Sequence, residues 1–221
     1  MADGWTRWRD DVFGDPYLVW HDGPDFRRLS KRARSAPDDV ARMLAAGLDA
    51  DDPLAAQSIC ALNDNGLAPA GTEALLRGAV SRATGTFLVQ VAQALHALTG
   101  DESWATPIAA VLVSDAFWGV RIDAATALTG FAPTPELVET LARGVRDEEY
   151  LVRYHCANTL LRYAGRKKDL WDYRSLFDLV ATPAEGEPTD ADRAKWAEAT
   201  NRLVRSVNGG AGGPGTRGRP S

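Results

Sequence analysis

The sequence predicts an all-α protein, an α-α superhelix in which antiparallel helix pairs stack as a solenoid. Three observations predict this fold class. Ala, Leu and Arg are abundant, and Gly and Pro gather at the ends of apolar stretches, a composition that favours helices over sheets. Within those stretches, apolar residues recur with the period of a helix. Stretches of one kind then return along the chain at intervals of 30–36 residues, which is the length of a helical repeat.

The second helix of each repeat is marked by a leucine that closes a run of small residues. A small residue stands four positions before this leucine, and a glycine follows it, where the chain can turn. Small side chains let neighbouring helices approach closely, and stacking buries an apolar face that a single pair cannot bury. The leucines are Leu62, Leu98, Leu128 and Leu160, the small residues Ser58, Ala94, Ala124 and Cys156, and the glycines Gly66, Gly100, Gly130 and Gly165.

A first helix precedes the second in each repeat, with apolar residues at positions i, i+3, i+4 and i+7. Thr134 and Pro135 supply a capping hydroxyl and a proline suited to the first turn. Asp101 and Asp147 are placed to cap the segments that follow them. Each repeat is therefore predicted as two helices joined by a turn and ended by a glycine. The first helices cover residues 40–48, 73–80, 107–113 and 136–145.

Two second helices carry a shared motif, VRIDAATAL at 120–128 and VRYHCANTL at 152–160. Their pattern, V-R-x-x-A-A-x-A-L, resembles the HEAT-repeat family in its short bacterial form. The looser repeat pattern extends over 37–165, where Ala55 and Val91 stand in place of the motif arginine. The resemblance implies a right-handed superhelix of antiparallel pairs, whose second helices line a concave wall that most often binds other macromolecules.

An aspartate precedes each motif arginine by six positions. Its carboxylate can accept hydrogen bonds from the free amides at the start of the second helix, where the helix dipole favours an anion. The arginine can reach the aspartate of its own unit or of the adjacent one, and HEAT-like proteins use such ladders for stacking. We interpret Asp115, Arg121, Asp147 and Arg153 as a structural ladder.

The positions between the core residues of the second helices point away from the core and form two rows. One row is Gln57, Gln93, Asp123 and His155, and the other is Cys60, His96, Thr126 and Asn158. We expect them to line the concave wall, where mixed side chains suit recognition of a partner, although an ordinary solvated helix face has the same pattern. The predicted partner-binding residues are Gln93, His96, Trp118, Ile122, Asp123, Thr126, Tyr154, His155 and Asn158.

Three segments are predicted along the chain: an aromatic N-terminal segment over 1–36, a helical solenoid over 37–207 and a disordered Gly-rich tail over 208–221. The N-terminal aromatics either cap the apolar end of the solenoid or anchor a partner, and we favour the cap. They are Trp5, Trp8, Phe13, Tyr17, Trp20 and Phe26.

The C-terminal part of the solenoid follows the pattern more loosely. Residues 170–181 are predicted as one helix. Thr189 is expected to cap a last amphipathic helix that runs through Val207. Asp192, at the third position of that helix, makes a partial capping box with Thr189. These two helices would close the C-terminal end.

The middle of the chain is acidic. Residues 37–165 hold 16 acidic and 8 basic residues, and the whole chain has a net charge of −5. A surface that binds duplex DNA must neutralise phosphates, so nucleic acid is not the expected partner. The exception is FRRLSKRARS at 26–35, which suits nucleic acid or an acidic partner, or else pairs with the acidic body as a solvated helix face.

The sequence contains no arrangement of residues that indicates catalysis or metal binding. His155 and Cys156 are adjacent, so they project about 100° apart on a helix and do not chelate together. Cys156 is interpreted as a small core residue, and Cys60 has no obvious basic neighbour to activate its thiol. The glycine-rich residues 209–218 lack the Lys-Ser/Thr pair of a phosphate loop. No catalytic residue, metal or cofactor is predicted.

The expected function is a non-catalytic protein-binding module (adaptor, regulator or immunity-type inhibitor) that uses the concave face of its second helices. The alternative is a HEAT-like DNA-repair glycosylase or a bilin-lyase-like enzyme or accessory; Trp118, Arg121 and Asp123 offer the glycosylase residue types without that family's motif. No stretch approaches the roughly 20 apolar residues of a membrane span, and the N-terminus lacks the apolar run of a secretory signal. We therefore expect a cytoplasmic monomer or homodimer whose partner is another protein.

Overall fold

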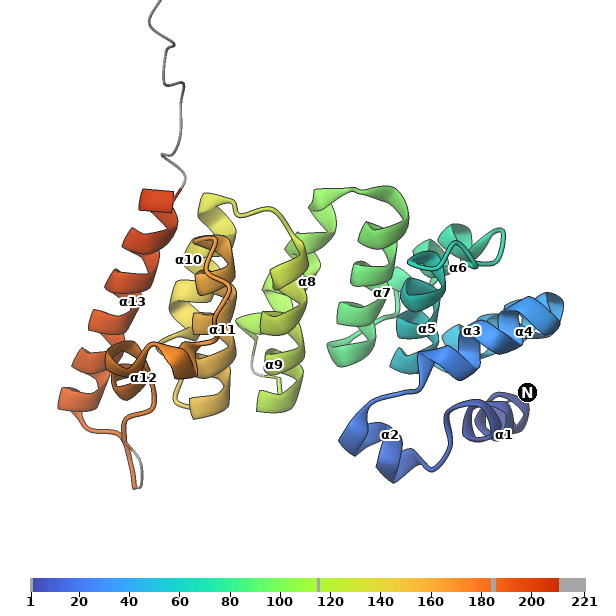
Figure 1. Cartoon of the computed structure of the whole chain (residues 1–221), viewed down its shortest axis with the longest axis horizontal. Helices are drawn as coiled ribbons and strands as arrows, with labels where there is room; N and C mark the ends of the chain where they lie inside the picture. Colours follow the sequence, from blue (N-terminus) through green and yellow to red (C-terminus); the bar gives the residue numbers. More distant parts are fainter. Residues whose placement is uncertain (1, 115, 184–185, 211–221) are drawn as a thin grey trace, which may run out of the picture. The chain divides into compact units, whose positions relative to one another are not determined.

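The computed structural model describes residues 2–114, 116–183 and 186–210. These residues form helices joined by short connections, and none of them lies in a β-strand (Figure 1). The prediction of an all-α protein is confirmed. The chain divides into two compact units, Met1–Pro107 and Ile108–Ser221. This boundary falls inside residues 37–207, which the repeat pattern predicts as one solenoid.

Unit 1 consists of two regular helix pairs and three further helices at its N-terminal end. In each pair the first helix packs against the second, α4 on α5 and α6 on α7, and the two second helices α5 and α7 lie side by side. The amide of Asn63 joins them by donating to the carbonyl of Ala97 at 2.9 Å. The helices are α1 (Ala2–Phe13), α2 (Pro16–Asp22), α3 (Phe26–Ser35), α4 (Pro37–Asp49), α5 (Pro53–Asn63), α6 (Thr72–Val80) and α7 (Gly85–Thr99).

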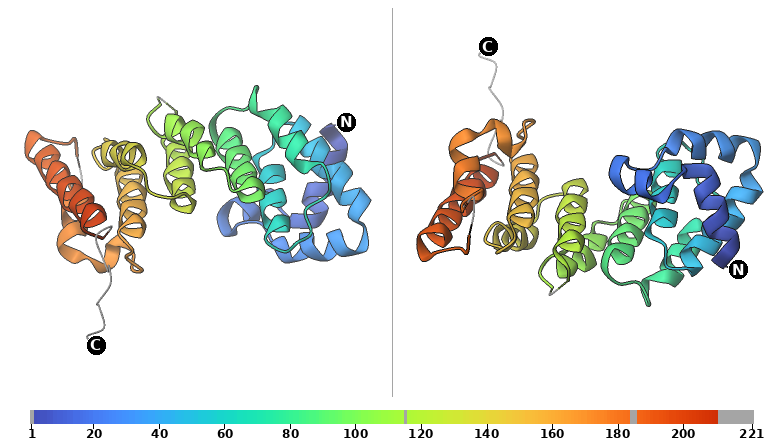
Figure 2. Two further views of the ribbon diagram at one scale, coloured as in Figure 1. Left: turned by 90° about the horizontal axis from the view of Figure 1, so that it is seen from above. Right: turned by 90° about the horizontal axis from the view of Figure 1, so that it is seen from below.

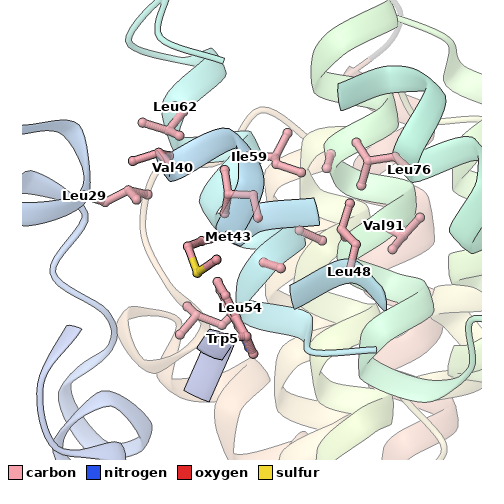
Figure 3. Packing of buried hydrophobic residues seen from close by; sticks show 14 of the residues in the cluster. Trp5, Leu29, Val40, Met43, Leu48, Leu54, Ile59, Leu62, Leu76 and Val91 are labelled. Atoms are coloured by element: carbon pink, nitrogen blue, oxygen red, sulfur yellow. The ribbon is translucent and has the colours of Figure 1, made fainter. Parts of the chain in front are cut away.

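The core of unit 1 is built from the apolar stripes of these helices (Figure 3). Leu44 of α4, Ile59 of α5 and Leu95 of α7 are fully buried. Gly47 allows α4 to cross α5 closely, because a Cβ placed there would lie 2.7 Å from the Cβ of Ala55. The small residues predicted at the contact positions of α5 and α7, Ser58 and Ala94, are fully buried as expected.

Helix α1 covers the N-terminal side of this core. Trp5, Trp8 and Phe13 are buried. The Trp5 indole packs against Gly47 and donates its N–H to the Asp52 carboxylate at 2.8 Å. A buried indole normally needs such an acceptor, and α4–α5 supplies one. These three aromatics therefore pack into unit 1.

The remaining N-terminal aromatics do not share that burial. Tyr17 on α2 is 66% exposed, and its ring stacks on that of His21 with centroids 6.1 Å apart. Phe26, the first residue of α3, is half-buried against the core. The side chain of Trp20 lies outside the described part of the chain. Within the described segment, then, α1 carries the buried aromatics and α2 the most exposed one.

Unit 2 is organised around α11, which contacts α9, α10, α12 and α13. Its helices are the end of α8 (Ala105–Leu112), which spans the boundary, and α9 (Trp118–Ala127), α10 (Pro135–Gly144), α11 (Tyr150–Tyr163), α12 (Arg174–Val180) and α13 (Asp190–Gly210). Two short 3₁₀ turns, Leu128–Gly130 and Leu170–Asp172, join some of them, and a third, Glu102–Trp104, precedes α8 in unit 1.

Glycine again sets the crossing of the pair α10–α11. A Cβ on Gly144 would collide with the side chain of Cys156, whose own Cβ lies 3.3 Å away. Cys156 is fully buried, which agrees with its interpretation as a core residue. Ala124 and Leu160 are fully buried as well, so the contact positions of the repeat motif face the core of unit 2.

Several predicted helix ends are confirmed. Thr134 caps α10 by accepting the amide of Leu137 at 3.3 Å, and Gly100 ends α7 with a left-handed φ of 67°, which glycine adopts at little cost. At α13, Thr189 and Asp192 form the capping box reciprocally, each side chain accepting the other's amide. Hydrogen bonds from Thr189 hold the pKa of the Asp192 carboxyl below its ordinary value.

One predicted helix is divided. Residues 170–181 contain a 3₁₀ turn, Leu170–Asp172, and a separate helix α12 that begins at Arg174. The amide of Leu170 donates to the side chain of Asn158 at 2.7 Å, and Leu170 is fully buried. This anchoring on α11 holds the turn in place, so the backbone changes direction at Tyr173 before α12 starts.

Candidate interaction face on helices α9 and α11

Helices α9 and α11 run side by side in the same direction. Three side-chain pairs fix their register: Arg121 with Asp147, Thr126 with His155, and Thr129 with Thr159. The residue numbers of the partners, which lie on α11 or just before it, rise in the same order as those on α9 and its C-terminal end. The two helices are therefore parallel. The register brings predicted site residues of two successive repeats onto one face.

We define the α9–α11 face by the side chains that line the open side of these helices. Successive turns of each helix contribute to it, because residues spaced by three or four share one side of a helix. The α9–α11 face comprises Phe117, Trp118, Ile122 and Thr126 from α9 and its start, and Leu151, Tyr154, His155 and Asn158 from α11.

One end of this face is apolar and exposed. Phe117 is 65% exposed, Trp118 37% and Leu151 40%. The rings of Phe117 and Trp118 pack against each other with centroids 4.8 Å apart. Ile122 follows Trp118 one turn along α9 and is half-buried. Large apolar side chains exposed together at the start of two helices form the kind of patch that marks interaction sites.

The other end of the face is a polar hollow of about 260 Å³. The Thr126 hydroxyl and the Nδ1 atom of His155 lie 3.3 Å apart across it. Arg162 pairs with Asp169 at 2.7 Å on its far side. The polar hollow is lined by Thr126, Thr129, Tyr154, His155, Asn158, Thr159, Arg162 and Asp169.

His155 supplies the imidazole of the polar hollow. It is half-buried between Thr126 and Tyr154, whose ring meets the imidazole edge-on with centroids 5.5 Å apart. Burial lowers the pKa of the His155 imidazole, and the nearby Asp123 carboxylate partly opposes this shift. The imidazole therefore favours its neutral form, which can both donate and accept a hydrogen bond.

The predicted partner-binding residues divide between the two units. Trp118, Ile122, Asp123, Thr126, Tyr154, His155 and Asn158 lie on α9 and α11 of unit 2. Gln93 and His96 lie on α7 of unit 1 and are half-buried. The Nε2 atom of His96 is 3.4 Å from a carboxylate oxygen of Glu102. Four of the seven residues in unit 2 line the polar hollow.

The sequence analysis did not predict every residue of this region. Phe117 and Leu151 extend the apolar end, and Arg162 and Asp169 close the polar hollow. Two consecutive aromatics at the start of α9, Phe117 and Trp118, were a readable signal for Phe117. Asp169 reaches the hollow only because the chain after α11 folds back, and no local pattern encodes that return.

The two arginines of the predicted structural ladder, Arg121 and Arg153, make different contacts. Arg121 forms an ion pair with the Asp147 carboxylate of the next repeat, within unit 2. The other oxygen of Asp147 accepts the amide of Glu149 at 2.9 Å. Asp147 therefore satisfies an amide just before α11 and at the same time holds α9. Asp115 lies outside the described residues.

Arg153 is buried, with 1% of its surface exposed. Its guanidinium donates to the carbonyls of Asp147, Glu148, Val180 and Thr182 at 2.8–3.1 Å. Its carbon atom Cζ lies 4.1 Å from the centroid of the Trp196 ring. Burial lowers the pKa of this guanidinium, although the surrounding acidic groups oppose the shift. Arg153 thus joins the start of α11 to α12 and α13.

A second hollow of about 840 Å³ lies between α10 and α13. Val138 and Ala142 of α10 and Val204 of α13 line it, with Glu139 and Arg205 also among its lining residues. In a regular stack the first helix of the next pair would pack beside α10. Here α12 contacts α11 and α13 instead and lies on the opposite side of α11 from α10 (Figure 2), so the groove stays open.

The described residues contain no group of three His, Cys, Asp or Glu side chains that could hold a metal ion. Burial raises the pKa of both thiols, Cys60 and Cys156, which makes each a poorer nucleophile. No helix in the described part of the chain has the length and hydropathy to cross a bilayer.

Comparison of the chain with models of protein families, with curated proteins and with solved structures finds no match.

Proposed function

We propose that this chain is a non-catalytic protein-binding module, a small solenoid of the HEAT-repeat type, and that the α9–α11 face contacts its partner. The observation that carries the proposal is the pairing of an exposed apolar end, Phe117, Trp118 and Leu151, with the polar hollow beside it. Interfaces combine these parts: buried aromatic anchors supply most of the affinity, and polar groups around them fix orientation.

The shape of the face suggests how a partner segment would bind. An apolar side chain of the partner would cover Trp118 and Leu151 at one end. A polar or amide-bearing side chain would enter the polar hollow, where the neutral His155 and the Thr126 hydroxyl offer both donors and acceptors. The repeat motif supports a solenoid, and so does the side-by-side packing of successive second helices within each unit.

The glycosylase alternative is less well supported. Arg121, the arginine that this alternative would place on the binding face, is paired with Asp147, and only 20% of its side chain is exposed. Breaking that pair would leave a half-buried carboxylate without its cation, which is costly. The surrounding region also carries the acidic excess of residues 37–165.

The proposal is tested by partner recovery with matched variants. The tagged chain is used as bait in an extract of its native host, alongside Leu151→Arg and Leu75→Arg. Leu75, on α6 of unit 1, is 43% exposed, close to the 40% of Leu151. Both variants place a charge on an exposed leucine, so solubility and stability change alike. We expect Leu151→Arg to lose the partner and Leu75→Arg to retain it; equal recovery by all three baits would contradict the proposal.

A further inference from the structure

Helix α3 carries an unusual concentration of positive charge. Its ten residues, Phe26–Ser35, contain five cations and no acidic residue, within a chain of net charge −5. Leu29 and Ala33 are buried and Phe26 is half-buried, which anchors one side of the helix on unit 1. The cations occupy the exposed side. They are Arg27, Arg28, Lys31, Arg32 and Arg34.

Most of this charge is left without a carboxylate. Arg32 pairs with Asp39 at 3.2 Å, and Arg28 donates to the backbone carbonyl of Asp11 at 3.0 Å. Among the described residues, Arg27, Lys31 and Arg34 form no ion pair. The sequence left open that this helix face pairs with the acidic body, and within the described ranges such a pair forms only at Arg32.

Some other helices pair an arginine with an acidic residue of the same helix. Arg77 pairs with Glu73 at 2.8 Å and Arg174 with Asp178 at 3.1 Å, each one turn apart on the same helix. On α3 the neighbours at the same spacing are other cations, as with Lys31 and Arg27. Like charges at that spacing destabilise a helix by about 0.2–0.5 kcal/mol per pair. The repulsion within α3 is relieved when an anion binds.

A small hollow lies beside this basic face. It measures about 320 Å³ and lies between α1 and α3. Three cationic residues and one acidic residue, Asp11, are among those that line it, so the cations are in excess. The lining residues are Asp11, Val12, Arg28, Lys31, Arg32 and Ser35.

We propose that α3 is a second interaction surface, which binds an acidic peptide segment of a partner protein. Arg27, Lys31 and Arg34 would contact carboxylates along the helix, and the hollow beside Arg28 would receive one acidic side chain. Ten helical residues are about 15 Å long, which matches about five residues of an extended peptide. Arginine clusters recognise acidic motifs in this way. The proposal does not depend on the α9–α11 face.

A peptide fits these observations better than a nucleic acid. A tightly bound duplex has about 6–10 of its phosphates contacted, whereas α3 offers five cations, one of them already paired with Asp39. A long polyanion would also be repelled by the acidic residues of 37–165. A short acidic segment senses mainly the charges within about 10 Å of it, because salt screens the rest.

The test measures binding of a fluorescent peptide of about five glutamates to the full chain by anisotropy, with a glutamine peptide as the blank. The variant is Arg27→Gln, Lys31→Gln and Arg34→Gln together. Its matched control neutralises three other exposed cations, Arg166, Lys167 and Lys168, also to glutamine. We expect the glutamate peptide alone to bind, with roughly tenfold weaker affinity for the α3 variant and no change for the control.

Three outcomes would overturn the proposal: no binding of the glutamate peptide by the unmodified chain, equal weakening by both triple variants, or tighter binding of a single-stranded oligonucleotide of the same charge. A second variant, Arg27→Lys with Arg34→Lys, keeps the charge and should keep at least half of the affinity. Melting temperature serves as the folding check, and removal of the α3 cations should leave it unchanged or raise it, because like charges no longer repel.

Discussion

The pair α4–α5 in unit 1 and the pair α10–α11 in unit 2 are built alike and covered differently. In both, a glycine near the end of the first helix faces a small residue of the second, Gly47 against Ala55 and Gly144 against Cys156. In unit 1, α1 adds Trp5 over the same crossing. In unit 2, Trp196 and Arg153 hold α13 on α11, and the groove beside α10 remains open.

This difference shows that the close contact at the glycine holds the two helices of a pair together. The further helices that pack on the pair determine which of its surfaces remains exposed. The indole of Trp5 uses a carboxylate acceptor, Asp52, that also caps α5. The buried guanidinium of Arg153 instead donates to backbone carbonyls and packs over the face of the Trp196 ring. Because α12 lies opposite α10, unit 2 keeps open surface beside α10 as well as on the α9–α11 face.

Removal of the aromatic cover should have the largest effect. Trp5→Ala deletes a side chain that is 2% exposed and leaves Asp52 without its indole donor. We expect the free energy of unfolding to fall by about 3–5 kcal/mol, the range for such core truncations. Urea denaturation measures it. Trp171→Ala, at a site that is 63% exposed, is the control and should change stability by less than about 0.5 kcal/mol.

Loss of the Arg153 clamp should come next. Arg153→Met keeps much of the volume but removes the donors to the four carbonyls. We expect a loss of about 3 kcal/mol, because buried acceptors lose their partners. Arg174→Met is the matched change, since 74% of that side chain is exposed and its pair with Asp178 lies on the surface. If the two variants lost equal stability, Arg153 would not hold α12 and α13 in place.

The shared crossing is tested with alanine at either glycine. Gly144→Ala meets the Cys156 side chain, and Gly47→Ala meets Ala55 and the Trp5 ring. Overpacking costs about 1–3 kcal/mol, part of which is offset by the better helix propensity of alanine. Gly78→Ala, at a position with open space around it, should be neutral or stabilising. Adding Cys156→Ala should restore most of the stability of Gly144→Ala and none of that of Gly47→Ala, as read from melting temperatures.

The smallest expected effect is a pH dependence at the α9–α11 face. The pKa of His155 is lowered in the folded state by burial, so the unfolded chain binds the proton more readily. The contribution of neutral His155 is then complete above the unfolded pKa of about 6.5 and is lost as the pH falls below that value. We expect the melting temperature of the unmodified chain to drop more between pH 7.5 and pH 5.5 than that of His155→Gln. An identical drop in both would exclude this role.

Much of the fold could be predicted from local pattern. Three of the four repeat leucines, Leu62, Leu128 and Leu160, are buried as their spacing predicted, whereas Leu98 is half-buried. The small residues at the contact positions of the second helices, such as Ala94 and Ala124, are buried too. The cap at Thr134 and the box at Thr189 depend on side chains next to the amides that they bind, so they too are readable from sequence. The part of the α9–α11 face that lies at helical spacing, Trp118 to Thr126, follows from the same periodicity.

The remainder depends on contacts between distant segments. The division of 170–181 arises because Asn158 binds the amide of Leu170, and Asp169 joins the polar hollow for the same reason. Asp147 pairs with Arg121 through its carboxylate, whereas Arg153 donates to backbone carbonyls. Which partner each arginine takes depends on where α12 and α13 pack. A sequence pattern with a period of 30–36 residues does not encode the placement of these last helices.

The most direct test of the central claim, that the α9–α11 face contacts the partner, is site-specific photo-crosslinking. A photoreactive phenylalanine is placed at Leu151 in one sample and at Leu75 in another, two positions of similar exposure, and the chain is illuminated in an extract of its host. We predict one discrete crosslinked species from position 151 and none from position 75. The same species from both positions, or from position 75 alone, would contradict the account.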